Sequence, residues 1–144
     1  MSETRDPLVV RHLRFGWWCI LGFLTLGICL EVMHGLKVDW YLGVANRTRR
    51  LMFTLAHAHG VLLGLVNVAF ALTLAHLGRG TASWPTASHA LVAATILVPG
   101  GFFLGGLVIY DGDPGRGVLL LPVGAVFLVV AIGLTAWHVT RSTD

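Results

Sequence analysis

The stretch GVLLLPVGAVFLVVAIGLTAWHV, Gly117 to Val139, decides the fold class. It contains no Asp, Glu, Lys or Arg. A helix needs about 20 mainly apolar residues to cross the hydrocarbon core of a bilayer. A helix on the surface of a soluble domain would carry a polar stripe along one side, and this stretch has none. It is therefore predicted to be a transmembrane helix.

Three further apolar stretches precede it, so the chain has four predicted spans in all: residues 15–36, 51–77, 88–110 and 117–139. The connections 37–50, 78–87 and 111–116 are short, which favours neighbouring antiparallel helices. We expect an all-α, antiparallel, up-down bundle of four transmembrane helices that forms one membrane domain over residues 1–144. Segment 37–50, which is basic, is expected to hold at most a short interfacial helix.

The composition agrees with a membrane protein. The chain has 144 residues, of which 56% are hydrophobic and 12% charged, whereas about a quarter of the residues in a soluble domain are charged. The formal net charge of +3 comes from arginines in the connections. This pattern makes nucleic acid an unexpected partner and indicates contact with membrane lipid.

The orientation of the spans stays open, because basic residues gather equally at both ends. One end carries Arg5, Arg11, Arg14, Arg79 and Arg141, and the other carries Lys37, Arg47, Arg49, Arg50 and Arg116. Aromatic residues form two predicted interfacial belts. These are Trp17, Trp18, Trp84 and Trp137 at the first end, and Trp40, Tyr41 and Tyr110 at the second.

Two histidines, His57 and His59, lie within the second span in the stretch LAHAHGVLLG. At about 100° per residue, His57 shares a stripe with small and polar residues, namely Thr54, Gly60, Gly64 and Asn67. We therefore expect His57 to face the interior, near a polar side chain of the first span. His59 points nearly the opposite way, toward lipid or a neighbouring protomer, and is the weaker candidate for a cofactor ligand.

The first span adds two more candidates, Glu31 and His34, which share one helix face near its end. Glu31, His34 and His57 could meet in one pocket, with Tyr110, Asp111 and Asp113 at its mouth. An ionisable group within a span suggests a functional site. His34 and His57 could ligate a haem b, and Glu31, His34 and His57 could bind a divalent metal. The same cluster could relay protons or hold a quinone headgroup. Alternatively, these residues snorkel to water and His57 bonds a backbone carbonyl.

The remaining histidines, His12, His76, His89 and His138, are expected to be interfacial anchors near the first end. The chain contains no nucleophile motif, phosphate-binding loop or Cys–His metal spacing. The sequence therefore lends almost no support to an enzyme. Two glycine pairs with GxxxG spacing, Gly60 with Gly64 and Gly101 with Gly105, predict close helix packing.

Several of these motifs, taken in order, resemble the YgdD-type family of small membrane proteins, which includes the eukaryotic transmembrane protein 256. MHGLK at the end of the first span is similar to the family's Ala-His-Gly signature, and a histidine likewise opens its second span. The stretches FFLGGLVIYDGDP, Phe102 to Pro114, and LLPVGAVFLVVAIGL, Leu120 to Leu134, resemble its third and fourth spans. The resemblance implies the four-helix fold and no particular reaction, and it matches His34 to the signature histidine.

Two classes of function remain open at this point. In the first, the chain is a non-catalytic packing or accessory component that associates with itself or with a larger membrane complex. In the second, it is a redox or ligand-binding protein that holds haem b, a metal or a quinone through His34 and His57.

Overall fold

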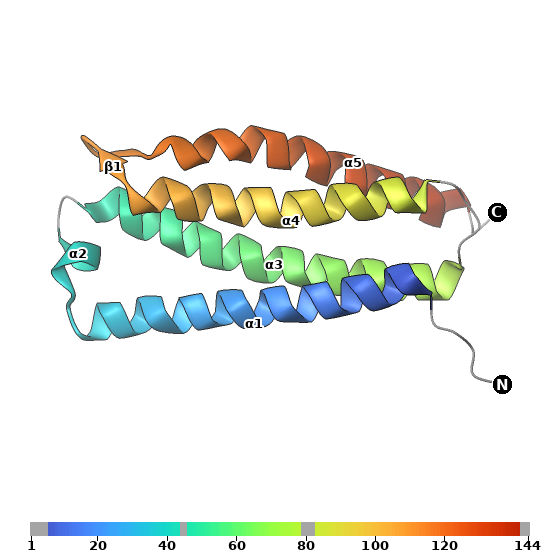
Figure 1. Cartoon of the computed structure of the whole chain (residues 1–144), viewed down its shortest axis with the longest axis horizontal. Coiled ribbons are helices and arrows are strands. Elements are labelled where there is room, and N and C mark those ends of the chain that lie inside the picture. The colour runs from blue at the N-terminus through green and yellow to red at the C-terminus, as the bar shows by residue number, and fades with distance from the viewer. Residues whose placement is uncertain (1–5, 44–45, 79–82, 142–144) are drawn as a thin grey trace.

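The computed structural model describes residues 6–43, 46–78 and 83–141. Its main elements are four long helices that lie side by side (Figure 1): α1 (Pro7–Gly35), α3 (Arg47–Leu77), α4 (Trp84–Leu107) and α5 (Leu120–Arg141). All four, α5 together with the 3₁₀ turn before it, are long and apolar enough to cross a membrane. The expected all-α class with four such helices is confirmed.

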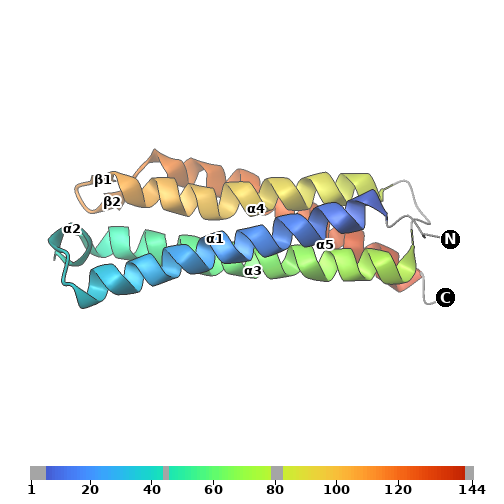
Figure 2. The same ribbon diagram turned by 60° about the horizontal axis from the view of Figure 1, so that its bottom comes forward.

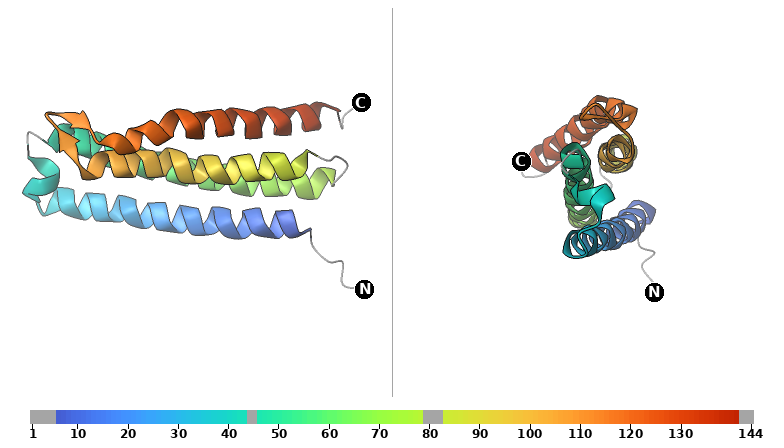
Figure 3. Two further views of the ribbon diagram at one scale, coloured as in Figure 1. Left: turned by 45° about the horizontal axis from the view of Figure 1, so that its top comes forward. Right: turned by 90° about the vertical axis from the view of Figure 1, so that its left-hand side faces the viewer.

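The long helices form a row of pairwise contacts. Helix α3 packs against both α1 and α4, and α5 packs mainly on α4. The view down the long axis of the molecule shows α1 and α5 on the two outer sides (Figure 3, right). The start of α1 and the end of α5 lie at the same end of the molecule (Figure 1). Because α3 and α4 are central, the buried core follows these two helices.

Short elements occupy the opposite end, where α2 (Asp39–Leu42) and a two-stranded hairpin lie close to the helix ends (Figure 2). The hairpin pairs β1 (Ile109–Tyr110) with β2 (Asp113–Pro114), and the 3₁₀ turn η2 (Arg116–Leu119) leads into α5. Asp111 and Gly112 have φ angles of 47° and 89°, as a tight two-residue hairpin turn requires. The described part of segment 37–50, before α3 begins, holds only the short helix α2, as expected.

One helix boundary was predicted wrongly. Helix α1 begins at Pro7, not at Phe15, because a polar capping residue extends it beyond the apolar run. The backbone N–H of Leu8 donates to the Asp6 carboxylate over 2.8 Å, and Pro7 occupies the first turn. A carboxylate cap followed by proline is a favourable helix start. The other helix ends lie within about four residues of the prediction.

The predicted GxxxG pairs pack inside the chain. A Cβ atom added to Gly64 would lie 2.7 Å from Ile20 of α1, and one added to Gly60 would overlap the Phe23 ring. Gly101 and Gly105 face Leu121 and Val118 in the same way. These glycines therefore let α1 approach α3 and α5 approach α4, so they are not free to pack against another copy of the chain.

The aromatic belts are only partly as expected. Five of the seven residues are exposed: Trp17, Trp18, Trp40, Tyr110 and Trp137. Trp84 and Tyr41 are instead buried in the two hydrophobic clusters of the core. Among the basic residues, Arg49 is also buried, while Arg5 and Arg79 lie outside the described residues.

Candidate functional site

The candidate residues Glu31 and His57 do come together, in a groove between α1 and α3. This α1–α3 groove has a volume of about 560 Å³, and its polar lining consists of Glu31, Tyr41, Thr54 and His57. Its apolar lining comes from α1 and consists of Leu24, Ile28, Leu30 and Val32, with Gly27 between them. The volume falls in the range of small-molecule sites.

His57 faces α1, as predicted, but its partner is the main chain. Its Nδ1 atom lies 2.7 Å from the carbonyl oxygen of Phe23. A carbonyl can only accept, so Nδ1 carries a proton, and in the neutral imidazole Nε2 is then an acceptor. The ring lies against Gly27, where an added Cβ would come within 2.5 Å of the His57 Cε1 atom. The expected contact with a polar side chain of α1 is not formed, and the stated alternative, a bond from His57 to a backbone carbonyl, is confirmed.

His59 is half-buried against its own chain, so the expectation that it points wholly toward lipid or a second protomer is corrected. Its Nδ1 atom donates to the Leu55 carbonyl of its own helix over 2.9 Å. Its ring packs on Phe102 of α4, with 4.9 Å between the ring centroids. The reason is the position of α3 in the row: because α3 lies between α1 and α4, two of its faces are covered by helices.

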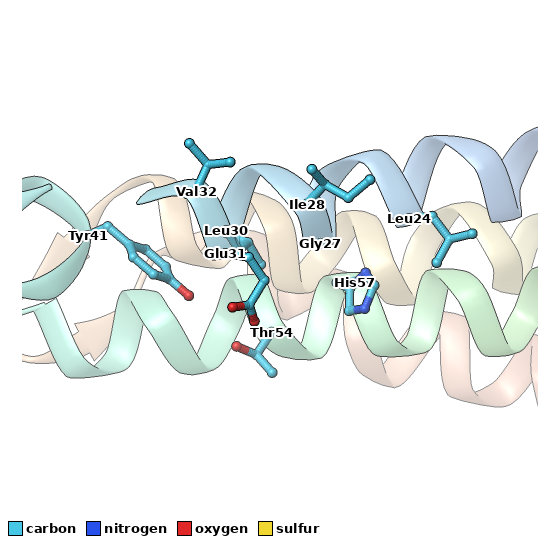
Figure 4. A pocket seen from close by; sticks show the side chains of 9 residues that line it. All are labelled: Leu24, Gly27, Ile28, Leu30, Glu31, Val32, Tyr41, Thr54 and His57. Carbon is cyan, nitrogen blue, oxygen red and sulfur yellow. The ribbon is translucent and has the colours of Figure 1, made fainter. Parts of the chain in front are cut away.

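The polar side chains that line the α1–α3 groove are directed into it. Figure 4 shows the Glu31 carboxylate and the Tyr41 and Thr54 hydroxyls directed toward the same stretch of the groove, with His57 further along it. Within the described chain, no hydrogen bond or ion pair joins any two of these four side chains. Tyr41 is only 5% exposed as a residue, but its hydroxyl, which has no described protein partner, is an accessible atom in the lining of the groove.

Other predicted members of the site lie elsewhere. His34 is exposed and does not line the α1–α3 groove. Tyr110 and Pro114 line a separate hollow beside Arg116, so the hairpin with Asp111 and Asp113 does not form the mouth of the groove. Among the described residues, no three His, Cys, Asp or Glu side chains are grouped closely enough to hold a metal ion. The geometry therefore gives the metal and haem interpretations no support.

A second polar cluster was missed by the sequence prediction. His12 was expected at the interface, but its side chain is fully buried, with 0% exposure. Its Nδ1 atom lies 2.7 Å from Asn67 Oδ1 and its Nε2 atom 2.7 Å from Ser88 Oγ. The ring also meets the edge of Phe70. His12 thus joins α1 to both α3 and α4.

The direction of each hydrogen bond in this cluster follows from its donors. The Asn67 amide group donates to the Leu63 carbonyl and to Thr95 Oγ1, both over 2.8 Å. Asn67 Oδ1 is then left to accept from His12 Nδ1–H, and His12 Nε2 accepts from the Ser88 hydroxyl. Thr95 in turn donates to the Leu91 carbonyl over 2.8 Å.

Every buried side-chain nitrogen or oxygen of the described residues has a partner. The His12 network therefore offers no free group to a ligand, and it acts as a connection between helices. A fully satisfied polar network of this kind fixes one arrangement of a core. Asn67 was predicted to face the interior. Nothing local in the sequence around His12 shows that a partner lies 55 residues away.

His138 is another corrected prediction, since it is buried as well. Its Nε2 atom lies 2.7 Å from Ser83 Oγ, and its ring packs on Trp84 at 4.6 Å between centroids. These contacts hold the end of α5 against the start of α4. His76 and His89 are exposed, which fits the predicted interfacial position.

Arg49 organises the end of the molecule next to the groove. Its guanidinium donates to the carbonyls of Gly106 and Trp40 over 3.1 and 2.8 Å and to Asn46 Oδ1 over 2.7 Å. It also lies 4.3 Å from the centre of the Trp40 ring. Arg50 donates to the Leu42 carbonyl over 2.8 Å. The two arginines thereby hold α2, and with it Tyr41, beside the groove.

Comparison with known protein families, with characterised proteins and with solved structures finds no match for this chain. The resemblance to the YgdD-type family thus stays an expectation from the sequence motifs. The candidate site has to be interpreted from its own geometry.

Proposed function

We propose that this chain is a multi-pass integral membrane protein in which each of the four long helices crosses the bilayer once, in up-down order. The helices contain 29, 31, 24 and 22 residues. At 1.5 Å per residue, about 20 residues span the ~30 Å hydrocarbon core. Both chain ends then lie on one side of the membrane, and α2 and the hairpin lie on the other.

Within the membrane, we propose a non-catalytic role as a component that packs against another membrane-spanning chain, either a second copy or a subunit of a larger complex. The observation that carries this proposal is the outer face of α5. In the most apolar 18-residue stretch of Arg116–Arg141, only 11% of the residues are buried inside the chain. The outer face includes Val126 and Val129, which are highly exposed.

Gly133 gives this face a point of close approach. A Cβ atom added to Gly133 would meet nothing within 4 Å, in contrast to the glycines that pack inside the chain. Small residues allow the backbones of two membrane helices to come close and to gain van der Waals contact. The outer face of α5 therefore offers apolar contact surface around an open glycine.

Native electrophoresis of gently solubilised membranes, followed by detection of the tagged chain, tests this role. The tagged chain is expected in an assembly larger than its monomer, and Gly133→Leu is expected to shift it toward the monomer. Gly22→Leu is the matched control, because a Cβ at Gly22 of α1 also meets nothing within 4 Å. A monomer in native membranes, or equal effects of the two substitutions, would refute the proposal.

A further inference from the structure

The α1–α3 groove is a place where hydrogen-bonding groups of the chain remain unused. Its two acceptors are the Glu31 carboxylate and His57 Nε2, the latter because His57 Nδ1–H is engaged with the Phe23 carbonyl. Its two hydroxyls, on Tyr41 and Thr54, have no described protein partner. Most of the Tyr41 side chain is buried, but its hydroxyl is an accessible atom in the lining of the groove, so a molecule in the groove can bond to it.

The two acceptors lie about one helical turn apart along the groove. His57 lies against Gly27, and Glu31 follows Gly27 by four residues on α1, or about 6 Å along the helix axis. A six-membered ring with a hydroxyl at each end extends over about one helical turn, so we expect it to reach from one acceptor to the other.

The depth of the groove indicates where such a molecule comes from, and this step rests on the membrane insertion proposed above. Helix α3 has 31 residues, or about 46 Å, so each end extends roughly 8 Å beyond a centred ~30 Å core. Thr54 then lies near the boundary of the hydrocarbon and His57 about 7 Å inside it, from the same rise per residue. The groove thus connects the headgroup region with the acyl chains, and its occupant is amphipathic.

Its chemistry favours the reduced form of a ring over the oxidised form. A hydroquinone has two O–H donors, whereas a quinone has only acceptor oxygens. A bond from a hydroxyl to the Glu31 carboxylate is charge-assisted, and such bonds are about twice as strong as neutral ones. The exposed side chains of Leu24 and Ile28 supply an apolar surface for a hydrocarbon tail.

We propose that the α1–α3 groove binds a hydroquinone of the bilayer, whose two hydroxyls donate to the Glu31 carboxylate and to His57 Nε2. The Tyr41 and Thr54 hydroxyls lie beside the ring oxygens and donate to them. The proposal concerns binding alone, and it adds a ligand site to the packing role proposed for the outer face of α5.

Calorimetric titration of the purified full chain in detergent tests the site. The probe is a decyl-substituted benzohydroquinone, kept reduced under argon, and the matched probes are its O,O-dimethyl ether and its quinone. The ether is more apolar but has no donor, so partition into detergent cannot explain weaker binding of the ether. We expect the hydroquinone to bind at least about tenfold more tightly than either, the factor of one good hydrogen bond.

Glu31→Gln is the decisive variant, because Glu31 is exposed and has no described protein partner whose loss would disturb folding. It is expected to weaken hydroquinone binding about tenfold, while His59→Gln, on α3 and outside the groove, leaves it unchanged. Equal binding of the hydroquinone and its ether, or an unchanged affinity in Glu31→Gln, would overturn the proposal. So would preferential binding of decylammonium, which would assign Glu31 to a cation. Binding is measured on the purified chain, so its failure is distinct from a failure of membrane insertion or of assembly.

Discussion

The Nδ1 atom of His12 lies 2.7 Å from the Oδ1 atom of Asn67, which joins α1 to α3 through two buried side chains. The pair belongs to a network in which Ser88 and Thr95 of α4 complete the hydrogen bonding. Since all of these polar groups are satisfied by one another and by backbone carbonyls, the network determines how three helices fit together.

Loss of either partner is therefore expected to destabilise the fold. His12→Leu leaves Asn67 Oδ1 and the Ser88 hydroxyl without their partner, at a cost of about 1–3 kcal/mol in the free energy of unfolding. Thermal or denaturant unfolding in detergent measures the change. His76→Leu, at an exposed position on α3, is the control and is expected to change the stability little.

The same pair predicts a coupling between the two positions. His12→Leu combined with Asn67→Leu is expected to cost less than the sum of the single substitutions, by about 1 kcal/mol, since hydrogen bonds between membrane helices have this order of coupling. A strictly additive double variant would show that the bond between His12 and Asn67 does not contribute to stability.

The contact between Gly27 and His57 predicts a steric effect with a specific rescue. Gly27→Ala places a methyl group within 2.5 Å of the His57 ring and is expected to destabilise the chain by about 1–3 kcal/mol through overpacking. Adding His57→Ala removes the ring and is expected to reduce the penalty of Gly27→Ala. Gly22→Ala on the same helix meets nothing within 4 Å and is expected to be harmless. Unfolding curves of Gly27→Ala, His57→Ala, the double variant and Gly22→Ala give the comparison; an equal effect of Gly27→Ala with and without His57 would contradict it.

The two histidines of the second long helix are expected to differ in their effect on ligand binding. His57→Leu removes an acceptor from the α1–α3 groove, whereas His59→Leu removes only a bond within α3 and a contact with Phe102. Hydroquinone binding is expected to fall about tenfold in the first variant and to stay unchanged in the second. A larger loss in His59→Leu would place the site on the other face of α3.

Arg49 is expected to be irreplaceable by lysine. Its planar group donates to carbonyls of both the α2 region and α4 and stacks on Trp40, and a single ammonium cannot reproduce that geometry. Arg49→Lys is expected to speed hydrogen exchange of the amides in residues 39–43, measured by mass spectrometry. Arg47→Lys, at an exposed position, serves as the control. Equal protection in both variants would mean that the other contacts of α2 are sufficient.

The helices could be predicted from the sequence because their cause is local. A run such as Gly117 to Val139 contains too few polar side chains for a surface helix of a soluble domain. This holds whichever other helices pack against it. The observed start of α1 also has a local signal in the sequence, since Asp6 followed by Pro7 is a helix-start pattern. The Asp111–Gly112 pair similarly indicates a tight hairpin turn.

The partners of the polar residues could not be predicted in the same way. Whether His12 is exposed or buried depends on Asn67 and Ser88, which lie 55 and 76 residues further along the chain. His59 was assigned to lipid because a single helix does not reveal how many neighbours it has. Once α3 is placed between α1 and α4, both histidines of its HAH motif must face a helix.

Labelling of single cysteines tests the proposal that the four long helices cross a membrane in up-down order. Cys19 and Cys29 are replaced by alanine, and one cysteine is introduced at Asp39, Arg116, Pro85 or Arg141. Sealed vesicles are then treated with a membrane-impermeant maleimide before and after permeabilisation. We predict that Asp39→Cys and Arg116→Cys react from one side and that Pro85→Cys and Arg141→Cys react from the other. Reaction of Asp39→Cys and Pro85→Cys from the same side would rule out the up-down crossing of the membrane.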